Sequence, residues 1–546
     1  MLFKVYKTFQ IYIRSIKYLK AEQFVFLIFN RLRINFFQKK INIHEEFSPI
    51  NKYIFLKKNN CISKNKYEFN FINKIIVFDK KIDWNFNSYG KLWNYNLNYL
   101  DFLNQKFQSN ILFEKVIKDF SNSYSGLKYG KDPYPTSIRI LNLIKYSLTK
   151  KNQCSRIIHI LRKDIHRLFN NLEYHLQGNH LLENGFALWT ASYVFNNKDL
   201  RVFSRSLIKK ELNKQILNDG AHFELSPMYH KIILVRLLES ISIAKSNLDL
   251  TDKNFLKFLS KKADIMLGWI LKITNYNDYF IRINDSIEGI APKLSDIMTL
   301  AQTLDVRPVA IKLKESGLRI LDNSKSLKSI ESQKSFFCLV DISEIKSSYQ
   351  PGHSHADTFN FILFFDKKPF IVDPGISTYD ISPKRLIERG TVYHNTVLID
   401  NQNNNEIWSS FRMGNRANVN IIKDTSDNII ATHDGYKSKK ITHRRNWTRI
   451  NNQIIIKDNI LSKGKHVTEF NLHLHPQIKI INVEKIKKIL INNGCVIQFS
   501  GALKIIIKDY FYAHEFNKCS KAQKISVLFH KKLITKIYFD ENIISV

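Results

Sequence analysis

The chain has 546 residues, of which 44% are hydrophobic and 13% aromatic. It is too long for one hydrophobic core and too apolar for a disordered chain, so we expect two or three folded domains. The formal net charge of +36 predicts attraction to a polyanion such as nucleic acid, anionic lipid or an acidic polysaccharide. Abundant Lys, Asn and Ile are also typical of AT-rich coding sequence, so charge alone identifies no partner.

Several classes of protein are disfavoured at once. The five cysteines lie far apart without a CxxC pair, which argues against a disulfide scaffold and against a Cys-ligated zinc or iron–sulfur site. No run of about 18 apolar residues predicts a membrane-spanning helix, and the N-terminus does not resemble a secretory signal. The basic and aromatic N-terminal segment could lie on a membrane surface, but we expect a helix that caps a larger domain.

The hydrophobic pattern divides the chain into three parts. Residues 1–85 predict helices with an irregular link. Residues 86–328 carry apolar side chains at helical spacing, as in SIRILNLIKYSLTK, and predict an all-helical domain of antiparallel hairpins. Residues 329–546 carry short alternating or β-branched runs, as in FNFILFF and QIIIKDNIL, and predict an antiparallel β-sandwich.

The first polar cluster is EYHLQGNHLLENGFAL in the helical domain. Gly178 is expected to end one helix and Asn179 to cap the next. His180, Glu183 and Asn184 then recur at helical spacing and share one face. Such a face either lines a cleft or forms a hydrogen-bonded cluster between helices, and this stretch alone does not decide between them.

The second polar cluster is DGAHFELSPMYHKIIL. Ser226 followed by Pro227 predicts an N-cap and the first helical residue, which puts Tyr229 in the first turn. The positive end of the helix dipole favours a tyrosinate there, so we expect a depressed tyrosine pKa and a role as proton donor or acceptor. A tyrosine that only packs is equally compatible with the pattern.

The third cluster begins with GHSHADTFNFILFF and continues to RGTVYHNTV. His353 and His355 are two apart at the entry to a predicted strand, so their side chains can point to one side. The strand KPFIVD should return antiparallel and bring Asp373 near them, and the next strand could add His394. Two histidines and a carboxylate suit zinc or a similar ion and leave one position for water or substrate.

Seven segments in order and spacing resemble one family. They are KLWNYNLNYLDFL, DPYPTSIRILN, GNHLLEN, ELSPMYH, QPGHSHADTFNF, FIVDPG and YHNTVLIDNQNNNE, and they are similar to the heparinase II/III family of polysaccharide lyases. The resemblance covers roughly residues 85–480. It implies an incomplete α/α toroid followed by an antiparallel β-sandwich, with β-elimination at a uronic acid as the reaction.

The resemblance also implies roles for individual residues. Asn179 and His180 would neutralise the substrate carboxylate, and Tyr229 would act as base or acid with His353 as its partner across an interdomain cleft. A structural divalent metal, zinc by preference, would be bound by His355, Asp373 and His394. Asp357 is expected to support the site rather than to bind the ion. Five further residues are expected to support the site or contact sugar: Glu183, Asn184, Arg389, Glu406 and Arg412.

The expected function is therefore a lyase that cleaves an acidic polysaccharide or oligosaccharide. The alternative is a glycan-binding or processing partner in surface polysaccharide biosynthesis that uses the same cleft without elimination. A nucleic-acid partner is not expected, because no Lys/Arg-rich helix or aromatic RNA-binding motif is present. The family implies work in the cell envelope, with the cytoplasm as the alternative. The sequence does not predict an oligomeric state.

Overall fold

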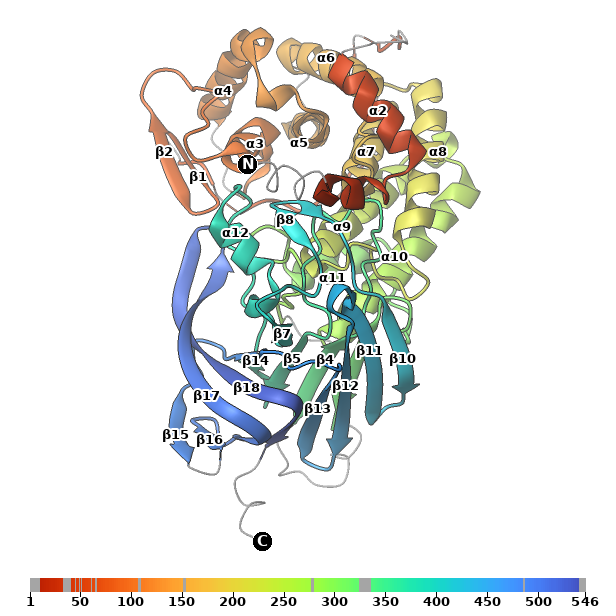
Figure 1. Cartoon of the computed structure of the whole chain (residues 1–546). Coiled ribbons are helices and arrows are strands. Elements are labelled where there is room, and N and C mark those ends of the chain that lie inside the picture. Colours follow the sequence, from red (N-terminus) through yellow and green to blue (C-terminus); the bar gives the residue numbers. More distant parts are fainter. Residues whose placement is uncertain are drawn as a thin grey trace.

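A computed structural model describes residues 10–32, 41–44, 46–48, 50, 52–59, 61–63, 66–106, 110–150, 154–275, 279–323, 335–484 and 487–539. Within these ranges a helical part is followed by an antiparallel β part, as the sequence predicts, and Figure 1 shows one stacked above the other. No helix in the described ranges is long and apolar enough to cross a membrane.

The N-terminal part contains helices and a β-hairpin. Residues 10–16 are helical, followed by α2 (Ala21–Leu32). Strands β1 (Tyr67–Phe71) and β2 (Lys74–Phe78) pair antiparallel, which differs from the expectation of helices with an irregular link. Ile72 and Asn73 have φ values of 49° and 59°, the left-handed conformation that a two-residue hairpin turn requires.

The helical part consists of α-hairpins, as predicted. Consecutive helices pack against each other in the pairs α5–α6, α7–α8 and α9–α10. The helices of this part are α3 (Lys91–Tyr99), α4 (Asn110–Ser123), α5 (Pro133–Lys150), α6 (Ser155–Asn170), α7 (Gly178–Val194), α8 (Lys198–Gln215), α9 (Pro227–Lys245), α10 (Lys253–Ile273) and α11 (Leu294–Thr303).

The β part contains two main sheets. The smaller has the order β3-β4-β5-β6, and the larger has the order β10-β11-β12-β13-β18-β17-β16-β15, with β14 pairing β18 and β7. The strands of the smaller sheet are β3 (Leu318–Asp322), β4 (Phe336–Asp341), β5 (Phe361–Phe365) and β6 (Lys368–Ile371). The strand β3 precedes the composition change near residue 328, so the sheet begins earlier than the sequence pattern indicated.

The larger sheet is built from strands of 3 to 21 residues. Its members are β7 (Val397–Ile399), β10 (Val419–Asp424), β11 (Asn428–Tyr436), β12 (Ile441–Ile450), β13 (Gln453–Leu461), β14 (Thr468–His473), β15 (Ile480–Glu484), β16 (Lys488–Ile491), β17 (Val496–Glu515) and β18 (Lys518–Tyr538). Short elements lie between the sheets and the helices: α12 (Pro383–Glu388), β8 (Ile407–Ser409) and β9 (Arg412–Met413).

The smaller sheet is the layer that joins the two parts. Cys338 and Leu363 pack into a core shared with the larger sheet, whereas Leu339 and Phe364 pack into the core of the helical part. Because alternate side chains of a strand point to opposite faces, both faces of this sheet are buried. That explains why β4 and β5 are continuous apolar runs rather than alternating ones.

The antiparallel pairing also determines where the functional loops emerge. The strand β5 starts where β6 ends, so residues 351–360 and 372–396 leave the smaller sheet at the same edge. The first segment carries the HxH motif, and the second carries α12. Both therefore meet the helical part at the boundary between the two parts.

Candidate active site and metal centre

A buried carboxylate lies at the centre of the candidate site. Asp285, in the link between α10 and α11, accepts hydrogen bonds from His353 Nδ1 (2.9 Å) and His355 Nε2 (2.8 Å). Arg385 of α12 donates to both carboxylate oxygens at 2.6 Å. The Asp285, His355 and Arg385 side chains are fully buried. One residue of the helical part thus holds both histidines of the HxH motif and a guanidinium from the β part.

The charges around Asp285 keep it ionised. Burial alone would raise the pKa of Asp285, but Arg385 and the two histidines outweigh it and hold this pKa well below its ordinary value. An ionised carboxylate only accepts hydrogen bonds, so His353 carries its proton on Nδ1 and His355 carries its proton on Nε2. In the neutral form of each histidine the lone pair is therefore on the other ring nitrogen, Nε2 in His353 and Nδ1 in His355.

Backbone contacts reinforce the same junction. The Asp285 N–H donates to the His353 carbonyl at 3.0 Å, and Asn284 Oδ1 accepts from the His355 N–H at 2.9 Å. Ser226 Oγ donates to the Asp285 carbonyl at 2.7 Å. Ser226 also caps α9 by accepting from the Tyr229 N–H, which confirms the predicted helix start.

Tyr229 and His353 come together from the two parts of the chain. Their ring centroids are 4.0 Å apart with an interplanar angle of 32°, and Tyr229 Oη lies 3.1 Å from Tyr379 Oη. The expected depression of the Tyr229 pKa is wrong: burial first, and then the neighbouring Tyr379, raise this pKa well above its ordinary value. Desolvation of the phenolate outweighs the helix dipole, so the Tyr229 side chain is a neutral phenol.

Three buried side chains form a candidate metal centre. The ligand atoms of His355, Asp357 and His394 lie within 4.8 Å of one another. His355 Nδ1, Asp357 Oδ2 and His394 Nε2 have no hydrogen-bond partner among the described residues. Burial raises the pKa of Asp357 to about 7; the neighbouring His394 opposes this shift, and the Asp341 carboxylate adds to it. Two imidazole nitrogens and one carboxylate oxygen without partners suit a divalent ion.

This arrangement differs from the predicted ligand set in one residue. Asp357, expected only to support the site, lies with the two histidines. Asp373 instead accepts from Nδ1 of His394 at 2.8 Å and from Asn360 at 2.8 Å. A carboxylate in this position orients the histidine and exposes its other nitrogen. Ligation of an ion by Asp373 stays a prediction.

Asn179 and His180 lie in the first turn of α7. The helix begins at Gly178 after the N-cap Gln177, so the prediction that Asn179 is the cap is wrong. Asn179 Nδ2 donates to Glu224 at 2.8 Å, and the residue is buried. His180 is 26% exposed, pairs with Glu173 at 3.0 Å, and its ring lies 4.4 Å from that of Tyr134.

The environment of His180 favours its charged form. Burial would lower the pKa of His180, but the Glu173 carboxylate outweighs this effect and raises the pKa above its ordinary value. Of the two residues predicted to neutralise a substrate carboxylate, His180 is therefore the cationic one.

The residues predicted to contact sugar are mostly engaged with protein. Glu183 is buried and pairs with Arg236 at 2.6 Å, while Asn184 donates to Glu173 at 3.1 Å. Neither exposes an atom to a substrate, so their predicted contact with sugar stays a prediction. Through Glu173, Asn184 supports His180.

The three predicted residues of the β part are spread over its surface and interior. Arg389 is buried and donates to the carbonyls of Ser354 (2.7 Å) and Ser409 (2.6 Å), which braces the loop that carries the HxH motif. Glu406 pairs with Arg14 at 2.6 Å. Arg412 is exposed in β9. Contact of these side chains with sugar stays a prediction.

Sequence reasoning missed four residues of the site: Tyr134, Asp285, Tyr379 and Arg385. The only sequence signal for Asp285 was a charged residue inside the apolar stretch IRINDSIEGI, which follows no helical or strand period. Tyr379 and Arg385 carried no signal, because their roles depend on contacts with residues about 100 to 150 positions away.

Comparisons with known proteins agree with the fold and the motifs. The family model described as "Heparinase II/III N-terminus" matches residues 151–306, and the one described as "Heparinase II/III-like, C-terminal" matches residues 306–540. The chain belongs to the heparinase II/III family. The resemblance found in the sequence is thereby confirmed.

Individual relatives of this heparinase II/III protein are distant. A heparin-sulfate lyase of Bacteroides stercoris is 25% identical over 57% of the chain and 47% of its own length. One of Bacteroides thetaiotaomicron is 22% identical over 62% of the chain and 51% of its length. The chain thus spans about half the length of the curated relatives it matches.

The solved structures support the fold. A crystal structure of heparinase III superposes with a TM-score of 0.63 at 16% identity, covering 85% of the chain and 80% of that protein. The predicted fold class, a helical domain followed by an antiparallel β-sandwich, is confirmed.

The first prediction concerns the stability of the junction. Replacing Asp285 with Asn removes the charge that balances buried Arg385, and leaving such a charge unpaired costs about 3–5 kcal/mol. We expect the free energy of unfolding in urea to fall by about this amount. Asp305→Asn is the matched control, because the Asp305 side chain is 79% exposed, and it should leave stability unchanged. Equal stability of the two variants would contradict the central role of Asp285.

Proposed function

We propose that the protein is a polysaccharide lyase that cleaves an acidic, uronate-containing glycan by β-elimination between its helical and β parts. The observation that carries this proposal is the contact of Tyr229 with His353, whose rings lie 4.0 Å apart. A neutral phenol beside an imidazole with a free Nε2 supplies a general acid and a general base that can act on the same sugar. His180 supplies a cation for the uronate carboxylate, and the names of the relatives point to the same chemistry.

The elimination requires two proton transfers: one from C5 of the substrate to the protein, and one from the protein to the leaving oxygen. Nε2 of His353 accepts the C5 proton, because Nδ1 is held by Asp285. The C5–H electron pair forms the C4–C5 double bond as the C4–O4 bond breaks. Tyr229, which is neutral, donates its proton to the leaving O4. Tyr379 lies within hydrogen-bond distance of Tyr229 and orients the phenol.

The substrate carboxylate gains negative charge as C5 loses its proton. His180⁺ is positioned to stabilise that charge, since it is held by Glu173 and remains partly exposed. Asn179 donates to Glu224 and lies in the same helical turn as His180, so this hydrogen bond helps to fix the turn. We therefore assign the electrostatic role to His180 and a positioning role to Asn179.

We further propose that His355, Asp357 and His394 bind zinc. When bound, the ion balances the buried Asp357 carboxylate and fixes the loop that carries His353. Asp373 orients His394 through Nδ1. The ion contributes rigidity to this loop, while the proton transfers belong to Tyr229 and His353.

Activity is tested by ultraviolet absorbance of the unsaturated uronate, with a panel of acidic polysaccharides. Tyr229→Phe and His353→Ala should each lower kcat/KM by about 10²–10⁴-fold, because each removes a proton-transfer group. Tyr67→Phe in β1 is the control and should retain full activity. Binding of acidic glycan by the wild-type protein without an unsaturated product would instead support the glycan-binding alternative.

The metal assignment is tested by elemental analysis of the purified protein. We expect bound zinc in the wild-type protein, and loss of the ion in His394→Ala and in Asp357→Asn. Asp373→Asn should retain the ion with about 10–100-fold weaker affinity, as expected for a residue that orients a ligand. Loss of zinc in Asp373→Asn with full retention in Asp357→Asn would show that Asp373 is the ligand and Asp357 the supporting residue.

The charge of His180 predicts a pH dependence. The raised pKa means that His180⁺ is present below this pKa and is lost as the pH rises through it, so activity should fall on the alkaline side. Glu173→Gln removes the carboxylate that raises the pKa and should move this alkaline limb to lower pH. Glu114→Gln, at an exposed position of α4, should leave the profile unchanged. An unmoved limb in Glu173→Gln would show that another group sets it.

A further inference from the structure

The two N-terminal helices present an apolar face to solvent. We call it the N-terminal face; its residues and exposed fractions are Ile13 (51%), Ile16 (47%), Phe24 (50%), Val25 (43%), Leu27 (37%) and Ile28 (42%). The spacing of three and four residues places these side chains together on each helix. In Figure 1 α2 lies at the outside of the helical part, across α7 and α8.

The opposite side of these helices is fixed to the protein. Gln23 is buried and its Nε2 donates to the carbonyls of Leu176 (3.4 Å) and Tyr349 (3.3 Å), one in each part of the chain. Arg14 pairs with Glu406, and Trp408 donates to Ser15 Oγ at 3.0 Å. The helices therefore cap the larger domain, as the sequence predicted. Their apolar face points outward because their polar face contacts the rest of the protein.

Lysine side chains lie beside the N-terminal face. Residues 10–32 contain four Lys or Arg, of which Arg14 pairs with Glu406, and one acidic residue, Glu22. Lys17 is exposed. Burial and then the charges of Lys214 and Lys210 lower the pKa of Lys20, so these α8 side chains lie near the N-terminal helices. Lys210 Nζ lies 3.8 Å from Glu22.

We propose that the N-terminal face docks the protein on an anionic lipid membrane. Half-exposed Ile and Phe side chains gain free energy by entering the acyl boundary, while neighbouring Lys side chains meet anionic headgroups. A polysaccharide offers no comparable apolar layer, and a second copy of the chain would bring a second face of the same charge against the first. A membrane interface offers both an apolar layer for the Ile and Phe side chains and negative charge for the Lys side chains.

Docking would also hold the candidate site near the membrane. Gln23 binds the segment just before Asn179 and the segment just before His353, so the N-terminal helices touch both sides of the site. A membrane-attached acidic glycan would then reach the site without release of the protein. The docking surface itself uses none of the residues assigned to elimination.

The test is flotation of the full chain with lipid vesicles. We expect binding to vesicles of phosphatidylcholine mixed with phosphatidylglycerol, and weak binding to phosphatidylcholine alone. The triple variant Ile16→Ser, Phe24→Ser, Ile28→Ser should bind the anionic vesicles about tenfold more weakly or worse. Lys17→Glu with Lys210→Glu should lose the preference for the anionic vesicles.

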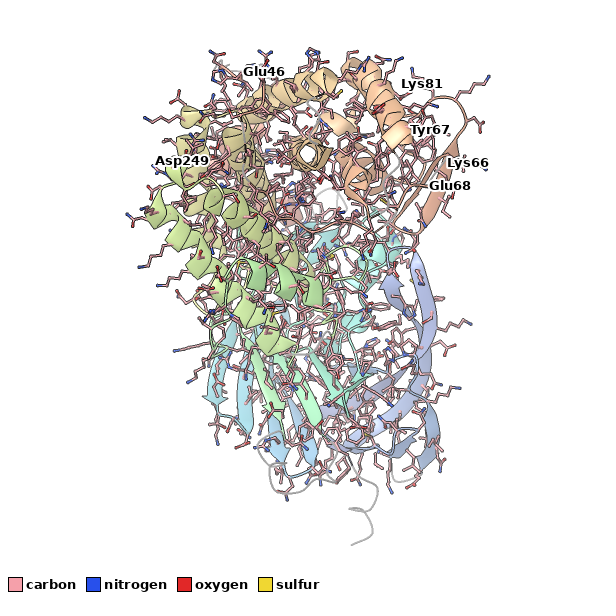
Figure 2. All side chains as sticks on the ribbon, turned by 180° about the vertical axis from the view of Figure 1, so that it is seen from behind. Glu46, Lys66, Tyr67, Glu68, Lys81 and Asp249 are labelled. Atoms are coloured by element: carbon pink, nitrogen blue, oxygen red, sulfur yellow. The ribbon has the colours of Figure 1, made fainter. Side chains whose placement is uncertain are left out.

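A matched control uses apolar residues that are equally exposed elsewhere. Ile75 and Val77 of β2 are 55% and 53% exposed, and their hairpin lies on another side of the helical part (Figure 1). Figure 2 shows this hairpin from behind, with Lys66, Tyr67 and Glu68 at the edge of the molecule. Ile75→Ser with Val77→Ser should bind vesicles as the wild-type chain does.

Several outcomes would overturn the proposal. They are no binding of the wild-type chain to either vesicle, equal binding to both, or equal binding of the triple variant. The face would instead belong to a dimer interface if the wild-type chain sediments as a dimer, the triple variant sediments as a monomer, and neither binds vesicles. Unsaturated-uronate activity is measured in parallel with a soluble glycan, so failure of docking is distinguished from failure of the proposed reaction.

Discussion

The site depends on how a buried aspartate is compensated. A carboxylate that is fully removed from water is tolerated only when donors surround it. Asp285 has four such bonds, two from Arg385 and one each from His353 and His355. These donors come from the β part and the acceptor comes from the helical part. The hydrogen bonds that this one buried charge needs therefore hold the two parts together. The domain junction and the candidate site are the same structure.

The same carboxylate also distinguishes the two histidines of the HxH motif. His353 donates through Nδ1 and His355 through Nε2, so their free nitrogens differ. The free Nδ1 of His355 joins the group with Asp357 and His394, which does not include His353. The free Nε2 of His353 belongs to the side chain that stacks on Tyr229. One acceptor thus leaves a different ring nitrogen of each histidine free, which is what the proposed roles of a base and a metal ligand require.

The sequence predicted those features that are local or periodic. The start of α9 at Ser226 and Pro227 follows from capping chemistry, and the return of β6 beside β5 follows from the short turn between them. The fold class follows from the change of hydrophobic period along the chain. The smaller sheet is the exception, since its residues are buried on both faces and a continuous apolar run does not distinguish strand from helix.

The rest of the site depends on contacts that are distant in sequence. Asp285 lies in an irregular link and meets Arg385 a hundred positions later. The choice between Asp357 and Asp373 depends on which nitrogen of His394 each carboxylate meets, and residue order does not contain that information. The pKa of Tyr229 differs from the sequence expectation for a related reason. The helix dipole can be predicted from sequence, but the burial that outweighs it is a property of the folded structure.

The electrostatics of the helical part resolve an apparent conflict. The proposed acidic substrate should avoid carboxylates, yet Glu173, Glu183 and Glu224 lie around His180. Each of them accepts a hydrogen bond from a donor: Glu173 from His180, Glu183 from Arg236 and Glu224 from Asn179. A carboxylate behind a histidine raises the pKa of that histidine and keeps it cationic, as it does for His180. Glu173 therefore strengthens the positive charge of His180 and fixes the direction of its ring, whereas Glu183 is balanced by Arg236 and Glu224 bonds to the neutral amide of Asn179.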